Sequence, residues 1–121
     1  MRKTLFPAFV VLPLLLAWAC RPPLASVELA AGVAAAQAGE WDEAVRHWQG
    51  VAAREPRSAA AHNNLAVAYE RNGEWDEAGK EYEAALGLDP ENAAIKNNFE
   101  RFKARLEAAG KGGSAAVGRT P

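Results

Sequence analysis

The sequence is short of the residues from which active sites are usually built. Its 121 residues include one cysteine, two histidines, three serines and two threonines. One cysteine excludes an intramolecular disulfide and a zinc site built from several thiolates, and so few polar side chains leave little scope for a nucleophile with its base. We therefore expect no enzyme activity, no metal and no cofactor. The formal net charge of −1 provides no basic field, so nucleic acid is not an expected partner.

Bulky side chains are also scarce. Aromatic residues make up 8% of the chain, whereas 28 residues are alanine. Alanine has the highest helix propensity but fills little core volume. The length and composition therefore predict one domain of closely packed helices with a thin core.

The first nineteen residues have the pattern of a secretory signal peptide. Arg2 and Lys3 give a positive start, and Leu5–Leu16 is uncharged and almost wholly apolar. Twelve residues rising about 1.5 Å each cannot cross a hydrocarbon core of about 30 Å. Ala17–Ala19 then offers the small-x-small pattern that a signal peptidase accepts. We expect residues 1–19 to form a signal helix that is removed.

Cys20, the only cysteine, follows this pattern directly. The segment Leu15–Cys20 resembles the lipobox of bacterial lipoproteins, in which the cysteine is acylated and becomes the first residue of the mature chain. The resemblance implies a lipid anchor on Cys20, a short linker over 20–24, and a place in the bacterial cell envelope, on the outer membrane facing the periplasm in a Gram-negative cell. Two alternatives stay open: ordinary cleavage after Ala19, which gives a secreted or periplasmic protein with a free thiol, and a retained signal anchor.

The rest of the chain repeats itself with a period of 34 residues. Gly39–Ala44, with the sequence GEWDEA, recurs unchanged as Gly73–Ala78. Pro56 returns as Pro90, again 34 positions later. The segments 63–65 and 97–99, NNL and NNF, have the same offset. A six-residue identity whose offset recurs elsewhere indicates an internal structural repeat.

Each repeat has the pattern of two antiparallel helices. Residues 59–72 carry apolar side chains at helical spacing, and Gly73 permits a tight turn at the end of that helix. A second apolar stripe follows and ends at Asp89-Pro90, because a proline disfavours helix in the residue before it. Neither helix can bury its stripe alone, so the repeats must stack.

The segment 59–92 resembles a tetratricopeptide repeat. The residues that carry the likeness are His62, at the position of an aromatic, Leu65, Ala66, Tyr69, Gly73, Ala78, Tyr82, Ala85 and Pro90. Residues 25–58 are a weaker copy with a first helix of small residues, and 93–109 have the charged outer face of a capping helix. The resemblance implies an all-α fold, a short right-handed α-solenoid of two repeats and a capping helix, with 110–121 as a flexible tail.

In this family the first helix of each repeat lines a concave groove that takes a peptide or a partner helix. The resemblance therefore implies a non-catalytic interaction module that binds a partner polypeptide, and such modules often serve assembly or secretion machines. The expected groove residues are Leu29, Val33, Gln37, Asn63, Asn64, Val67, Glu70, Arg71, Asn97, Asn98, Arg101 and Arg105.

Two questions about this groove stay open. The asparagines present both a donor and an acceptor, so they suit a peptide backbone, but they equally suit support of neighbouring loops. The first repeat gives an apolar end of the groove and the capping helix a basic end, which favours a partner segment with apolar residues followed by an acid. The alternative function is a self-stacking structural module, and weak self-association is a further expectation.

Overall fold

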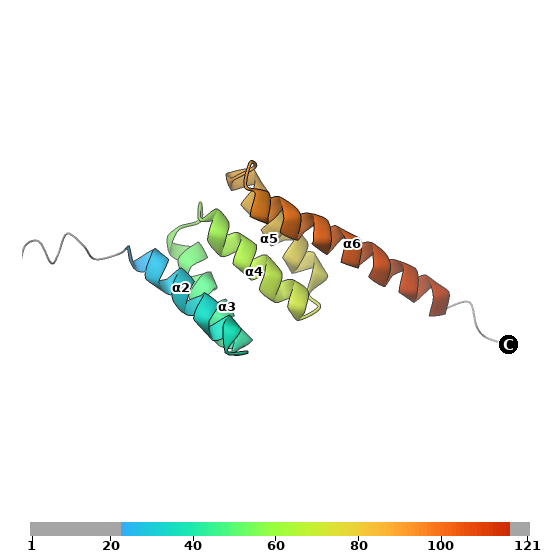
Figure 1. Ribbon diagram of the computed structural model, residues 1–121, viewed down its shortest axis with the longest axis horizontal. Coiled ribbons are helices and arrows are strands. Elements are labelled where there is room, and N and C mark those ends of the chain that lie inside the picture. Colours follow the sequence, from blue (N-terminus) through green and yellow to red (C-terminus); the bar gives the residue numbers. More distant parts are fainter. Residues whose placement is uncertain (1–22, 117–121) are drawn as a thin grey trace, which may run out of the picture.

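Five helices make up the part of the chain that the structure describes. The computed structural model describes residues 23–116, with side chains through Gly110. In chain order the helices are α2 (Leu24–Gln37), α3 (Trp41–Arg54), α4 (Ala59–Arg71), α5 (Trp75–Leu88) and α6 (Ala93–Ala116). Figure 1 shows the pair α2–α3, the pair α4–α5 and then α6 stacked one after another. No strand occurs within 23–116, and the prediction of an all-α helical solenoid is confirmed.

The same turn joins the two helices of each pair. Gly39 and Gly73 have φ angles of 84° and 77°, in the left-handed region that favours glycine. After Gly39, the backbone N–H of Glu40 donates to the carbonyl of Ala35 at 2.9 Å, and the equivalent bond follows Gly73. These bonds satisfy carbonyl groups at the ends of α2 and α4. The repeated GEWDEA segment therefore makes the same bend twice.

A short linker with a proline joins one helix pair to the next helix. Pro56 lies between α3 and α4, and Pro90 lies between α5 and α6. Ser58 caps α4, because its hydroxyl accepts from the backbone N–H of Ala61 at 3.3 Å. Asn92 takes the same place before α6 and accepts from two backbone N–H groups at 3.1 and 3.2 Å. These caps fix where α4 and α6 begin.

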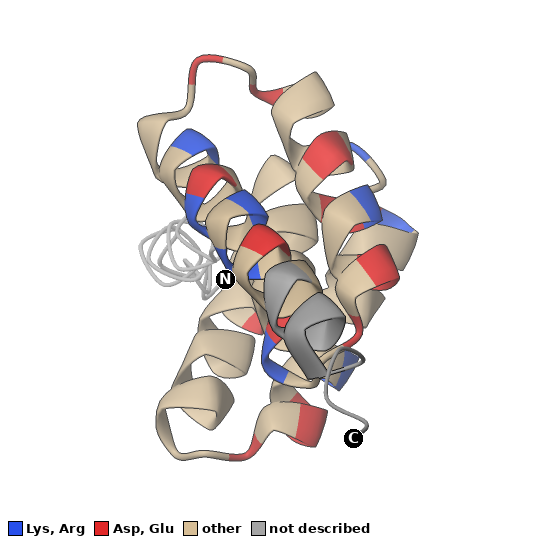
Figure 2. Ribbon diagram, turned by 90° about the vertical axis from the view of Figure 1, so that its right-hand side faces the viewer, with Lys and Arg blue, Asp and Glu red and all other residues tan. Residues whose placement is uncertain are grey.

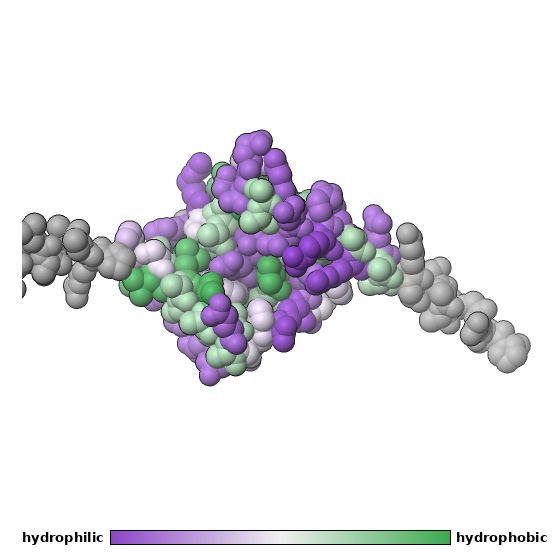
Figure 3. Space-filling view, viewed as in Figure 1, coloured by the Kyte–Doolittle hydropathy of each residue, from purple (hydrophilic) through white to green (hydrophobic). Residues whose placement is uncertain are grey.

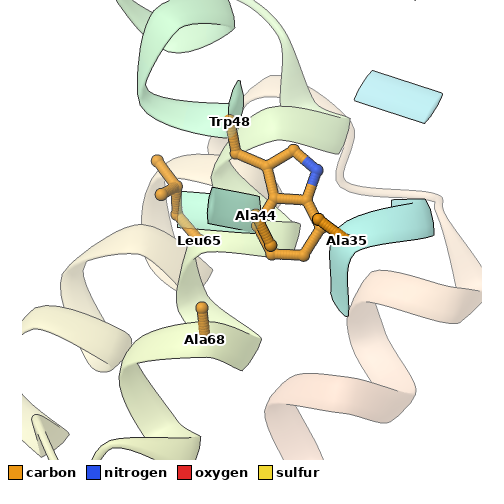
Figure 4. Packing of buried hydrophobic residues seen from close by; sticks show 5 residues of the cluster. All are labelled: Ala35, Ala44, Trp48, Leu65 and Ala68. Atoms are coloured by element: carbon orange, nitrogen blue, oxygen red, sulfur yellow. The ribbon is translucent and has the colours of Figure 1, made fainter. Parts of the chain in front are cut away.

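One aromatic side chain from the second helix of each pair anchors the stacking. Trp48 of α3 is 3% exposed and packs with α2 and with Leu65 and Ala68 of α4 (Figure 4). Tyr82 of α5 is 1% exposed and packs with α4 and with Phe102 of α6. The ring centroids of Tyr82 and Phe102 lie 5.2 Å apart. The helices thus bury their apolar stripes against the next pair, as the repeat pattern predicts.

The small residues of α2 make room for Trp48. Gly32 is buried under the indole ring, and a Cβ atom at this position would lie 2.7 Å from Cδ1 and 2.8 Å from Cε2 of Trp48. The indole Nε1 donates to the backbone carbonyl of Leu29 at 3.3 Å. The first helix, in which the sequence has small residues, is complete over Leu24–Gln37. Trp48 of α3 fills the space that these small residues leave.

A histidine and a glutamate also bridge each helix pair. In the first pair, Nδ1 of His47 on α3 lies 2.7 Å from Oε2 of Glu28 on α2. In the second pair, Nδ1 of His62 on α4 lies 2.6 Å from Oε2 of Glu81 on α5, and Nε2 of His62 lies 2.9 Å from the carbonyl oxygen of Pro56. His62 occupies an aromatic position of the repeat motif, but it acts as a half-buried polar partner.

The last helix runs further than the predicted capping helix. α6 continues to Ala116, so the predicted boundary at Ala109 lies inside it. Glycines at 110, 112 and 113 weaken helix propensity, but no proline blocks the backbone before Pro121. Residues 117–121 of the predicted tail, the predicted signal peptide 1–19 and Cys20 lie outside the described residues.

None of the helices in residues 23–116 combines the length and the apolar character that a membrane span requires.

Candidate binding groove

A hollow of about 450 Å3 opens between the first helices of the repeats. Its walls come from α2, α4 and α6, and two tryptophans of α3 close one side. The residues that line the hollow are Val33, Ala36, Gln37, Trp41, Trp48, Asn63, Asn64, Val67, Asn98 and Arg101. Seven of these belong to the twelve predicted groove residues, and their role in binding stays a prediction.

Three lining residues are missing from the predicted set, namely Ala36, Trp41 and Trp48. Trp48 is 3% exposed, so only its edge reaches the hollow, whereas Trp41 is half-buried. The indole Nε1 of Trp41 is buried with no hydrogen-bond partner among the described residues. Together with Val33 of α2, these side chains make the predicted apolar end of the groove.

Five predicted residues lie outside the hollow. Leu29 is half-buried and packs into the core beside α3. Arg71 lies over the ring of Trp41, with its guanidinium carbon 4.3 Å from the ring centroid. Asn97 is exposed on α6 and does not line the hollow. The remaining two, Glu70 and Arg105, bind one another.

Glu70 holds three helices together. One oxygen of its carboxylate, Oε2, accepts from the hydroxyl of Tyr82 on α5 at 3.0 Å, and the other lies 2.6 Å from Nη1 of Arg105 on α6. Burial raises the pKa of the Tyr82 phenol, and the adjacent Glu70 carboxylate raises it further. Tyr82 therefore stays protonated and donates. Glu70 and Arg105 support the wall of the hollow instead of lining it.

The three asparagines in the hollow are bonded to each other in a chain. Nδ2 of Asn98 on α6 donates to Oδ1 of Asn63 on α4 at 3.1 Å. Nδ2 of Asn63 donates in turn to Oδ1 of Asn64 at 3.5 Å, a long contact. Asn63 is thus engaged on both sides and supports the packing of α6 on α4. The amide N–H groups of Asn64 and the Oδ1 of Asn98 have no partner in the described part of the chain.

The basic end of the groove has one unengaged cation in the hollow. Basic residues and glutamates follow one another along α6 (Figure 2). Arg105 is paired with Glu70, and Lys103 is paired with Glu100 at 2.8 Å. Arg101 is exposed, lines the hollow and has no ion pair within residues 23–116. Among the side chains of α6 that are described, those through Gly110, Arg101 is therefore the cation that can pair with an acid of a partner.

The sequence profile described as tetratricopeptide repeat matches residues 29–93. This match covers more than half of the chain and runs from α2 to the start of α6. The chain belongs to the tetratricopeptide repeat family. Repeats of this family are protein–protein interaction modules, and this is the general role of this protein. A search of curated proteins gives no match.

The hollow of this tetratricopeptide repeat protein has the chemistry of a polypeptide site. One hollow brings together an apolar end and three polar groups. The polar groups are a donor on Asn64, an acceptor on Asn98 and the cation of Arg101. A peptide unit offers one N–H donor and one C=O acceptor, which complement the two asparagine groups. No group of three or more His, Cys, Asp or Glu side chains within 23–116 is arranged to hold a metal ion.

Proposed function

We propose that this protein is a non-catalytic adaptor of the bacterial cell envelope. It holds an extended segment of a partner polypeptide in the hollow between α2, α4 and α6, while a lipid on Cys20 keeps it at the membrane. The observation that carries the binding role is the set of unengaged polar groups on Asn64, Asn98 and Arg101 beside an apolar end. Assemblies that build or secrete envelope components are the setting in which such an adaptor serves.

The positions of these groups favour a particular kind of partner segment. An apolar side chain of the segment fits beside Val33 and Trp41, its backbone bonds to the asparagine pair, and a carboxylate meets Arg101. Asparagine contacts to the backbone tolerate many side chains, so sequence preference comes mainly from the apolar end and from the acid. The partner is therefore a peptide with an apolar residue followed by Asp, Glu or a C-terminal carboxylate.

The anchoring role rests on the N-terminal sequence. A positive start, the apolar segment Leu5–Leu16 and the Ala-Trp-Ala run precede Cys20. A thiol in an oxidising compartment is reactive unless it is capped. Stable attachment needs more than one acyl chain, which lipoprotein processing supplies. Mass spectrometry of the purified chain tests this: a mature chain that begins at an acylated Cys20 is expected, and a free thiol at residue 20 contradicts it.

Photo-crosslinking in living cells tests the binding role. A photoreactive amino acid at Val67, inside the hollow, is expected to give a discrete partner adduct, whereas the same amino acid at Lys80, exposed on α5, gives none. Adding Arg101→Glu should cut the Val67 adduct by about ten-fold, because it places a like charge opposite the partner's acid. Lys80→Glu is the matched control. Equal adducts from both positions, or no effect of Arg101→Glu, would contradict the proposal.

A further inference from the structure

The outward side of α2 is an uncharged apolar surface. Its residues, together with the C-cap Ala38, are named here the outer stripe: Leu24, Val27, Ala30, Ala31, Ala34 and Ala38. Leu24 and Val27 are 62% and 48% exposed, and Figure 3 shows hydrophobic side chains gathered over α2. The only charged residue of α2, Glu28, binds His47 of α3. The nearby hydroxyl of Ser26 donates to the carbonyl of Pro23 at 2.7 Å.

The corresponding side of the next first helix is covered. Ala61, Leu65 and Ala68 of α4, each 34 positions after a residue of the outer stripe, are 0%, 3% and 1% exposed. They pack against Val51 and Trp48 of α3. The outer stripe is thus the face that the solenoid covers with a preceding helix, and none of the described residues covers it.

We propose that a lipid surface covers the outer stripe, so that α2 lies along the bilayer that holds Cys20. This inference rests on the proposed lipid anchor. Residues 20–24 span at most about 17 Å even when fully extended, so Leu24 cannot lie further than this from Cys20. Leu24 and Val27 are therefore held next to the headgroups. A few apolar side chains suffice for contact, because the anchor already brings the surface to them.

A second copy of the chain fits the outer stripe less well. A helix of 14 residues is about 21 Å long and about 10 Å wide, so two such faces bury only about 400 Å2 in total, below the roughly 1,000 Å2 of a specific interface. The other end helix, α6, carries basic residues and glutamates along its length (Figure 2), whereas the outer stripe has no charge to pair with them. Contact through α2 also leaves α6 pointing away from the bilayer, since α2 and α6 lie at opposite ends of the stack (Figure 1).

Thiol labelling of the full chain in isolated membranes tests this orientation. A cysteine is placed by Val27→Cys on the outer stripe or by Leu106→Cys on α6, where Leu106 is 43% exposed; the unsubstituted chain gives the background from Cys20. With a membrane-impermeant maleimide, we expect Val27→Cys to react about five-fold less in membranes than after detergent, as for a side chain at the acyl boundary. Leu106→Cys should react equally in both. Equal reaction of Val27→Cys overturns the proposal.

Two other outcomes identify a different occupant and also overturn it. Protection that persists in detergent and disappears on dilution indicates a second copy. Protection in a chain whose mass still includes residues 1–19 indicates that the retained segment covers α2. A chain found in the soluble fraction without acyl mass shows that the proposed anchor itself fails, whereas a membrane-bound chain with a reactive Val27→Cys shows that only this inference fails. The Val67 crosslink reports on groove binding independently of both.

Discussion

The two repeats use the same interhelical bridge with its partners exchanged. In the first repeat the acid, Glu28, is on the first helix and His47 is on the second; in the second repeat His62 is on the first helix and Glu81 is on the second. The positions correspond, because 62 and 81 each lie 34 after 28 and 47. The distances are 2.7 and 2.6 Å. The repeat therefore preserves two facing positions, and each of them accepts either a histidine or a glutamate.

Exchange of the partners changes how each repeat responds to pH. In the first repeat the hydrogen bond from His47 lowers the pKa of Glu28. In the second, burial opposes the charged ring of His62, but the bonds to Glu81 and to the carbonyl of Pro56 outweigh it and raise the pKa of His62. The stabilisation that the first bridge provides thus depends on pH in the acid range, and that of the second bridge depends on pH near neutrality.

The repeats also differ in how they fit their aromatic anchor. Trp48 packs over Gly32, and Tyr82 of the second repeat packs over Ala66, 34 positions after Gly32. The larger ring, Trp48, faces glycine, and the smaller ring, Tyr82, faces alanine. Each helix pair therefore has its own match of ring size and facing residue. Substitutions that move one repeat toward the other test this comparison most directly.

The largest effect is expected from Gly32→Ala. The added Cβ would approach Nε1, Cδ1 and Cε2 of Trp48 closer than 3 Å, and this overpacking should lower the free energy of unfolding by about 2–3 kcal/mol, against a gain in helix propensity of about 1 kcal/mol. Urea denaturation of the full chain measures it. Gly79→Ala is the control, because its Cβ would meet Phe102 at an ordinary 3.7 Å. Trp48→Tyr should restore stability to Gly32→Ala; a failure to do so would mean that ring size is not the cause.

A smaller loss is expected from Glu70→Ala. The first repeat has Ala36 at the corresponding position, so the second repeat alone depends on this carboxylate. Its removal leaves the hydroxyl of Tyr82, a residue only 1% exposed, without a partner, which costs about 1 kcal/mol. Chemical denaturation of the full chain measures the loss. It should shrink in a Tyr82→Phe background, and an undiminished loss there would contradict the role of this bond.

The pH dependence of unfolding should differ between the bridges. Because the pKa of His62 is raised in the folded state, its stabilisation is complete below the ordinary value of 6.5 and is lost as the pH rises through the raised pKa. Because the pKa of Glu28 is lowered, its stabilisation is present above 4.5 and is lost as the pH falls through the lowered pKa. Thermal melts of the full chain between pH 3 and 9 are expected to show both slopes. His62→Gln should flatten only the neutral one and Glu28→Gln only the acid one.

The smallest effect is expected from the double change Glu28→His/His47→Glu, which gives the first repeat the order of the second. Since both residues stay in contact, the melting midpoint at pH 6 should fall by no more than about 3 °C, less than for either single change. The exchange also breaks the contacts of His47 with Glu43 at 3.4 Å and of Glu28 with Arg54 at 3.9 Å, but such partly exposed pairs contribute little. The second repeat already has Glu77, the counterpart of Glu43, one turn from Glu81. A double variant worse than both single ones would show that the two positions are not interchangeable.

Sequence periodicity predicts the helices and which faces meet, but not which side chains become partners. The turns at Gly39 and Gly73 and the stacking on Trp48 follow from the 34-residue period. Periodicity places Glu70 and Arg105 at groove positions. In the structure one oxygen of the Glu70 carboxylate binds the Tyr82 hydroxyl and the other binds Arg105, so both residues support the packing of the helices. The end of α6 was also beyond prediction, because the helical continuation past Ala109 depends on weak propensities alone.

The fit of Trp48 over Gly32 also bears on how the chain finds its register. Two segments with the same GEWDEA bend offer each helix two hairpin partners during folding, within one molecule or between two. An α3 helix that chose α4 as its hairpin partner would drive its indole into the methyl group of Ala66, and an α5 helix that chose α2 would leave a void beside Gly32. The different sizes of the side chains at this one contact therefore favour correct pairing of the helices in two hairpins of nearly identical sequence.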